Sequence, residues 1–221
     1  MDDVGLTVAV YADLRYPVLV SGGRQGLDDG GRALEDDLKL SWCVQAAQFH
    51  RLEETSMKYA ETVLPEFDAE MALTRKVLER VPEDKFDWRA HPKSNTVGWN
   101  ANHLAEIPGW VEAMLTLPSL DFAPPGGEPY RSPQLATCQE ILDLFDRNVA
   151  AARKAIAAAT DQDVAEQWSC LYAGELLFTM PRAAVLRSFL LNHTIHHRAI
   201  LCVYLRLNDI PVPGLYEPVG R

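Results

Sequence analysis

One stretch of the sequence, residues 182–208, limits the folds open to this chain more than any other. It contains no Gly or Pro, and its apolar residues return every three to four positions, the spacing of one face of an α-helix. At ~3.6 residues per turn it spans roughly seven turns. Thr179 is the expected N-cap, and Pro181 fits the first turn. Asn208, followed by Pro211, predicts the end of this helix.

Two histidines interrupt the apolar stripe that this helix is expected to turn inward. His193 and His197 are four residues apart, so their imidazoles lie one above the other and can share a metal ion. A pair of hydrogen-bonded core histidines, or of exposed ones, has the same spacing, so the pair alone leaves both interpretations open. The stripe consists of Leu186, Leu190, His193, His197, Ile200 and Tyr204.

The composition narrows the classes of function. A chain of 221 residues, 48% of them hydrophobic, is expected to form one globular domain with a core. A formal net charge of −10 argues against binding of nucleic acid or an anionic membrane, because both require a basic surface. No apolar run approaches the ~20 residues of a membrane span. We therefore expect neither nucleic acid nor a membrane among the partners.

The N-terminus and the cysteines predict a cytoplasmic protein. The chain opens on the acidic Met1-Asp2-Asp3, where an export signal is basic. The four cysteines have no CxxC pairing and are expected to be reduced thiols. For Cys202, one turn beyond the histidines, a small buried apolar side chain is favoured over a redox or ligand role. The other cysteines are Cys43, Cys138 and Cys170.

Residues 1–56 lack the patterns of the rest of the chain. The Gly-rich run SGGRQGLDDGG cannot form a core, and amphipathic helices with end signals begin only after Met57. We expect an N-terminal extension that is a real appendage, is disordered, or is translated from a start site assigned too early. In each case we expect it to be dispensable for the fold and for a metal site. The domain then comprises residues 57–221.

Three further segments have the period of amphipathic helices. Ser94 or Thr96 can cap the second of them, and Pro108 is expected to kink it or to end its first half. Thr137 and Glu140 form a capping box before the third. Together with the long helix they predict an all-α fold, an up-down-type four-helix bundle. The three expected helices cover residues 65–81, 96–117 and 138–160.

The connections add two features to this bundle. A Pro- and Gly-rich segment, residues 121–133, is long enough to serve as a crossover past the end of the bundle or as a lid. Residues 168–180 predict a small β-hairpin between helices 3 and 4, with Trp168 and Phe178 covering one end of the bundle. Trp88 is expected to anchor the loop before the second helix to the core.

The second helix offers a third nitrogen ligand, because His103 lies among its apolar neighbours. Sites in helical bundles are built from side chains on facing helices. Three histidines and an open position are typical of a catalytic zinc-type site, although His103 taken alone is more typical of a satisfied core histidine than of a ligand. Glu106, one turn later, can orient a ligand imidazole or act as a base near the metal; an exposed helical glutamate is the plain alternative.

Three segments of the chain resemble the DinB/YfiT-like superfamily of damage-inducible, metal-binding four-helix bundles. They are VPEDKFDWRAHPKS, NHLAEIPGW and LNHTIHHRAILCVYLRLNDIPVPGLYEP, and the resemblance extends over residues 57–218. It implies a divalent metal bound by His103, His193 and His197. Glu217 departs from it, since related sequences often have Gly before this Pro.

The resemblance also bears on activity and assembly. It implies a metal-dependent enzyme, a thiol-dependent S-transferase that joins a low-molecular-weight thiol to a small electrophilic substrate. A metal-dependent hydrolase and a non-catalytic metal-binding stress-response module are the alternatives. Three imidazoles suit zinc, nickel, iron and copper alike, and zinc, nickel or iron is expected. Apolar surface in excess of what one bundle hides, together with the resemblance, predicts a homodimer.

Two residues beside the expected ligands have open roles. His196 lies about 100° around the helix from His197, and we expect it behind the metal ligands or on a dimer surface. Arg198 can pair with an acid at an interface, receive an anionic substrate, or be an ordinary surface arginine.

Overall fold

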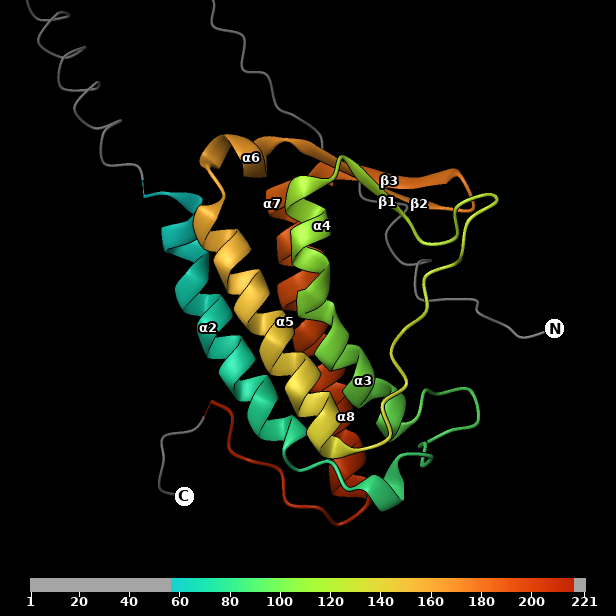
Figure 1. Cartoon of the computed structure of the whole chain (residues 1–221). Coiled ribbons are helices and arrows are strands. Elements are labelled where there is room, and N and C mark those ends of the chain that lie inside the picture. The colour runs from blue at the N-terminus through green and yellow to red at the C-terminus, as the bar shows by residue number, and fades with distance from the viewer. Residues whose placement is uncertain (1–56, 217–221) are drawn as a thin grey trace, which may run out of the picture. The chain divides into compact units, whose positions relative to one another are not determined.

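The computed structural model describes residues 57–216, which form a helical bundle with a small sheet at one end (Figure 1). The predictions for residues 1–56 and for Glu217 lie outside the described residues. Within the described part, none of the helices is long and apolar enough to cross a membrane. The α-helices are α2 (Tyr59–Leu78), α3 (Val97–Glu106), α4 (Val111–Thr116), α5 (Cys138–Ala158), α6 (Asp161–Ala165), α7 (Arg182–Val185) and α8 (His193–Leu207). The strands are β1 (Ser119–Asp121), β2 (Gln167–Tyr172) and β3 (Glu175–Pro181).

The predicted bundle is confirmed, and the crossover determines the direction of its helices. α3 and α4 run toward the end of the bundle where the sheet lies, and α5 begins again at the opposite end (Figure 1). α5 therefore runs parallel to α3 and α4, which requires a connection along the length of the bundle. Residues 122–137, irregular in structure, provide it, and we call them the crossover segment.

The second helix has the predicted cap and the predicted interruption. The hydroxyl oxygen of Thr96 accepts a hydrogen bond from the backbone N–H of Trp99 at 3.1 Å. At Pro108 the helix tightens into a 3₁₀ segment, Ile107–Trp110, before it continues as α4. This follows from proline, which lacks the N–H that an α-helix needs at that point.

The first helix begins earlier than predicted, at Tyr59 rather than at residue 65, so that Pro65 lies inside it. Two contacts stabilise the additional turn and a half. The backbone N–H of Tyr59 donates to Asp161 Oδ1 at 2.7 Å, and Val63 is buried in the core. Burial of apolar surface thus outweighs the hydrogen bond lost at proline.

The fourth helix also differs from prediction at its start and in its middle. Thr179 lies in β3, where its hydroxyl contacts Ser169 Oγ at 2.7 Å, and the helix starts at Arg182 with Pro181 at the cap position. Residues Leu186–Asn192 form a π-helix between α7 and α8. The apolar spacing of the sequence does not distinguish a π-helix from an α-helix, so the prediction of one regular helix was wrong.

The predicted hairpin is confirmed and belongs to a three-stranded sheet. β2 and β3 pair antiparallel, and β1 adds to β2 in parallel. The turn consists of Ala173 and Gly174, both with positive φ, as two-residue hairpins require. Trp168 is buried and Phe178 packs against it, so both cover the bundle end as predicted.

Arg198 is not a surface residue, since only 2% of it is exposed. Its guanidinium lies 2.5 Å from Glu70 Oε2 and donates to Thr74 Oγ1 at 3.2 Å and to the Tyr216 hydroxyl at 2.5 Å. Arg198 therefore joins α8 to α2 and to the C-terminal tail. This pairing uses its charge within the chain, which corrects the three roles considered from the sequence.

Removal of the Glu70 carboxylate should strongly destabilise the protein. Glu70→Ala leaves the buried charge of Arg198 without its acidic partner, and we expect the free energy of unfolding to fall by about 3–5 kcal/mol in urea titrations. Asp68→Ala is the matched control on the same helix, because its pair with Arg153 is exposed and should contribute at most about 1 kcal/mol. Equal losses in the two variants would contradict this account.

Candidate metal centre

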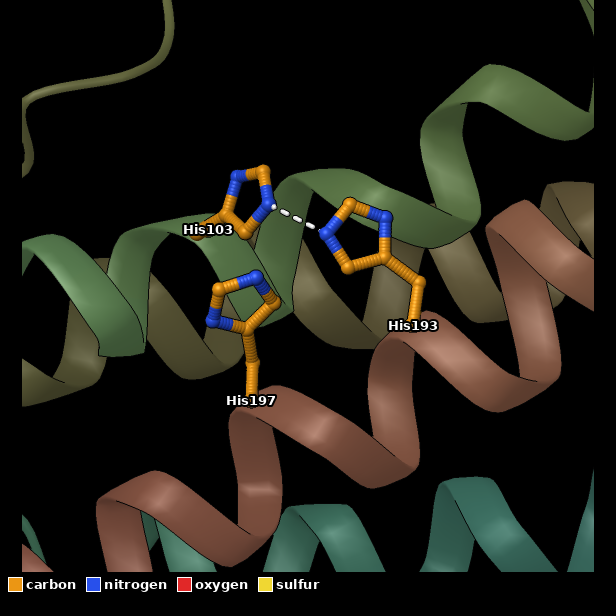
Figure 2. A group of neighbouring side chains, drawn as sticks. All are labelled: His103, His193 and His197. Atoms are coloured by element: carbon orange, nitrogen blue, oxygen red, sulfur yellow. Dashed lines mark hydrogen bonds between the residues drawn. The ribbon is translucent and has the colours of Figure 1, made fainter. Parts of the chain in front are cut away.

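The three histidines predicted as ligands come together in the interior of the bundle. His193 and His197 project from successive turns of α8, and His103 projects from α3 toward them (Figure 2). One ring nitrogen from each lies within 4.8 Å of those from the other two. His103 Nε2 and His193 Nε2 are 3.1 Å apart, and His103 and His197 are both buried. Side chains 90 residues apart in the sequence thus form one cluster.

The far side of the His103 ring is held by a buried carboxylate. His103 Nδ1 lies 2.5 Å from Glu106 Oε1, and Glu106 is only 3% exposed. A carboxylate accepts hydrogen bonds, so Nδ1 carries the proton in this pair. Nε2 of the neutral ring then carries a lone pair that is directed into the cluster, toward His193 Nε2.

Asn100 places His197 in the same way. His197 Nδ1 lies 3.1 Å from Asn100 Oδ1, and the amide nitrogen of Asn100 donates to Thr96 O at 2.8 Å. The second bond identifies which end of the amide faces His197, so Nδ1 is the donor. His197 Nε2 is left as a buried lone pair without a hydrogen-bond partner among the residues that the structure describes.

These nitrogens fit a divalent metal. A buried polar atom without a partner is costly unless something binds it, and the unpaired His197 Nε2 faces two other imidazoles. The Nε2 separation of 3.1 Å between His103 and His193 is close to the about 3.3 Å between two ligands of a tetrahedral ion at ~2.0–2.1 Å. Three neutral nitrogen donors suit zinc and its neighbours rather than calcium or magnesium.

Burial keeps two of the imidazoles neutral, as metal ligands must be. Desolvation, assisted by the nearby imidazoles His103 and His196, lowers the pKa of His193 to about 3. Desolvation, with His103 and His193 as the next causes, lowers the pKa of His197 to about 2. Protons therefore compete weakly for these nitrogens near neutral pH.

Aromatic rings surround the cluster. Trp99, one turn before His103 on α3, stacks on its ring with centroids 4.5 Å apart. Trp110 lies edge-on to His103, with ring centroids 5.5 Å apart. The centroids of Trp110 and His193 are 5.8 Å apart. Phe189, in the π-helix, lies with its ring centroid 6.5 Å from that of His193. These rings displace water from the imidazoles, which strengthens electrostatic interactions inside the site.

The remaining sequence candidates lie outside the cluster. His196 is exposed, although its ring is 4.9 Å from that of His197. Cys202 is buried, and desolvation raises the pKa of its thiol, in keeping with a packing role. Trp88 packs on Tyr204 at 5.4 Å, which confirms it as the anchor of its loop.

The sequence did not indicate several residues that complete the site. Asn100 could have been found, because it is a polar residue on the apolar face of its helix, three positions before His103. Tyr130 and Ser132 lie in the crossover segment, which has no periodicity to indicate which side chains turn inward. Both nevertheless donate to Glu106 at 2.9 Å.

The fold and the site define the class of this protein as a four-helix bundle with a three-histidine cluster in its interior. Two solved structures share the fold. A DinB-like protein from Bacillus cereus ATCC 10987 is 24% identical with a TM-score of 0.55, and the match covers 72% of this chain and 98% of that one. A DinB-like protein from Bacillus subtilis is 13% identical with a TM-score of 0.52, covering 71% of this chain and 99% of that one.

The sequence places the chain in a family. The profile of the DinB superfamily matches residues 66–201, more than half of the chain. The chain belongs to the DinB superfamily, whose members typically bind a metal, and all three histidines lie within the match. A separate comparison with curated proteins found no match.

The metal-free protein should lose stability as the pH falls from about 6.5 to 5. His193 and His197 have lowered pKa values in the folded protein, so below the unfolded value of about 6.5 they take up protons only on unfolding. Each contributes a slope approaching about 1.4 kcal/mol per pH unit. Urea midpoints measured after chelation would show it, and His197→Gln should flatten the slope by about half. A midpoint that is constant over this range would contradict the burial of neutral imidazoles.

Proposed function

We propose that the protein binds one divalent metal ion, zinc, nickel or iron, through His103, His193 and His197. The observation that carries this proposal is the buried lone pair of His197 Nε2, which lacks a partner among the described residues and faces the other two imidazoles. The tautomers assigned by Glu106 and Asn100 support it, because they turn bare nitrogens toward one point. Three protein ligands leave a coordination position for a small molecule.

The metal centre would serve a thiol-dependent S-transferase. A bound divalent metal supplies a Lewis acid that lowers the pKa of a thiol, which is ~8.5 when free, or of a water molecule. The aromatic side chains Trp99 and Trp110 would exclude bulk water from the reacting groups. The thiol would be a low-molecular-weight cosubstrate, and its partner a small electrophile.

We also propose a cytoplasmic location, which would suit the use of such a thiol. Cys138, Cys170 and Cys202 are free, so the described part of the chain contains no disulfide. Free thiols of this kind are typical of a reducing compartment, in which low-molecular-weight thiols are also kept reduced.

Glu106 would act by orienting His103 rather than as a base. Its carboxylate is buried and contacts His103, Tyr130 and Ser132 at once. A base would need an oxygen free to take a proton from a substrate. With both oxygens already accepting hydrogen bonds, the carboxylate is suited to fixing the tautomer of the ligand.

We also propose a homodimer formed through the exposed side of α8. Val203 and Leu207 are 53% and 59% exposed, although both are apolar. With the exposed His196 they lie on one helical face, at intervals of seven and four residues. A symmetric dimer would bury this face on both copies.

The metal assignment predicts about one metal ion per purified chain, measured by elemental analysis. His193→Ala should lose most of it, because only two of the three imidazole ligands then remain. His196→Ala is the matched control, since that exposed ring lies outside the cluster and its loss should leave the metal in place. Full retention of metal by His193→Ala would exclude the proposed ligand set.

The transferase proposal predicts metal-dependent consumption of thiol. The protein, reconstituted with zinc, nickel or iron, is screened with low-molecular-weight thiols against small electrophiles, and His193→Ala should abolish the conjugation. Metal-dependent hydrolysis without thiol would favour the hydrolase instead. Metal binding without turnover of any compound would favour the stress-response module.

The dimer predicts a mass twice that of one chain in light scattering. Val203→Glu combined with Leu207→Glu should produce monomers, because two charges per copy would be buried at the interface. Leu176→Glu, an exposed leucine on the hairpin, should leave the dimer intact. A monomer at all protein concentrations would contradict the proposal.

A further inference from the structure

The crossover segment, residues 122–137, carries two hydroxyl groups to one buried carboxylate. Tyr130 Oη donates to Glu106 Oε2 at 2.9 Å, and Ser132 Oγ donates to Glu106 Oε1 at 2.9 Å. These residues lie 24 and 26 positions from Glu106 in the sequence, so the contacts are tertiary. We call the two hydroxyls and the carboxylate the hydroxyl clasp.

The clasp and a metal ligand share the same carboxylate. Glu106 Oε1 accepts the hydrogen bond from His103 Nδ1 and also the one from Ser132 Oγ. Because only 3% of Glu106 is exposed, water cannot replace a lost donor easily. The position of the carboxylate, and with it the His103 ring, therefore depends on both hydroxyls.

The tyrosine is held as a donor by its surroundings. Trp110 Nε1 donates to Tyr130 Oη at 3.1 Å, so the phenol accepts one hydrogen bond and donates another to Glu106. Burial raises the pKa of Tyr130 to about 12, which keeps the phenol protonated near neutral pH. Even so, 44% of Tyr130 remains exposed, so the clasp lies at the surface of the molecule.

We propose that Tyr130 and Ser132 are positioning residues for the metal centre, which act on His103 through Glu106 and so couple the crossover segment to metal affinity. This inference rests on the proposed metal site. Partners behind a metal ligand typically change metal affinity about 10–100-fold. By thermodynamic linkage, metal binding must strengthen closure of the clasp by the same factor by which the clasp strengthens metal binding.

The first test measures Zn²⁺ affinity of the full chain by competition with a chelator. Tyr130→Phe and Ser132→Ala together should weaken binding about 10–100-fold. Ser132→Thr, as a single substitution, keeps the hydroxyl and should retain the affinity of the unchanged protein. Tyr172→Phe, at an exposed tyrosine on the hairpin, should also bind as the unchanged protein does. A purely structural role would lower the urea midpoint and leave the affinity of the folded chain unchanged.

The second test uses a protease site inside the clasp. Arg131 is exposed between the two hydroxyl residues, so trypsin can cut the Arg131–Ser132 bond when the clasp opens. Zn²⁺ should slow this cut by the factor found for affinity, and the double variant should lose the effect. Cleavage after Lys93, in the loop before α3, is the internal control and should not follow the clasp substitutions.

The outcomes separate the two proposals. If the unchanged chain binds Zn²⁺, His193→Ala abolishes binding, and the clasp variants bind as tightly as the unchanged chain, only the positioning role is overturned. If cleavage after Arg131 is independent of Zn²⁺, the coupling is overturned as well. If the unchanged chain binds no Zn²⁺, both the proposed function and this inference are overturned.

Discussion

The arrangement of the site depends on one constraint, the burial of imidazole rings between the apolar faces of two helices. An imidazole buried between α3 and α8 must have its nitrogens hydrogen-bonded or coordinated, because an unsatisfied buried polar atom costs about 1–3 kcal/mol. Glu106 and Asn100 satisfy the outer nitrogens of His103 and His197. The inner nitrogens then face one another instead of the protein. The bundle satisfies one side of the cluster and leaves the other for a ligand.

The direction of the helices explains why a loop takes part in this site. α4 and α5 run parallel, so the chain must return along the whole bundle between them (Figure 1). The long return brings polar side chains past α3, and Asn102 fixes the end of the segment by accepting from the Leu135 N–H at 2.8 Å. Topology thus supplies the donors that a buried carboxylate needs.

Local chemistry predicted much of the fold and the histidine cluster. The caps at Thr96 and Thr137, the break at Pro108 and the hairpin each depend on neighbouring residues, and each is found in the structure. The rest depends on distant partners. A charged Arg198 on a helix predicts exposure unless its acid on another helix is known, and the hydroxyl of Tyr130 reveals no partner in an aperiodic loop. The three histidines came together as expected, while the groups that orient them could not all be identified from sequence.

The π-helix Leu186–Asn192 connects α7 and α8, which pack on different parts of the protein. Its N-terminal part, α7, packs on the sheet and α6, whereas α8 packs on α2 and α3. A π-helical hydrogen bond encloses one residue more than an α-helical one, and each residue of an α-helix corresponds to about 100° of rotation. The π-helix therefore changes the rotation of α8 about the helix axis relative to α7. As a result, α7 can pack on the hairpin while the side of α8 that carries the histidines faces α3.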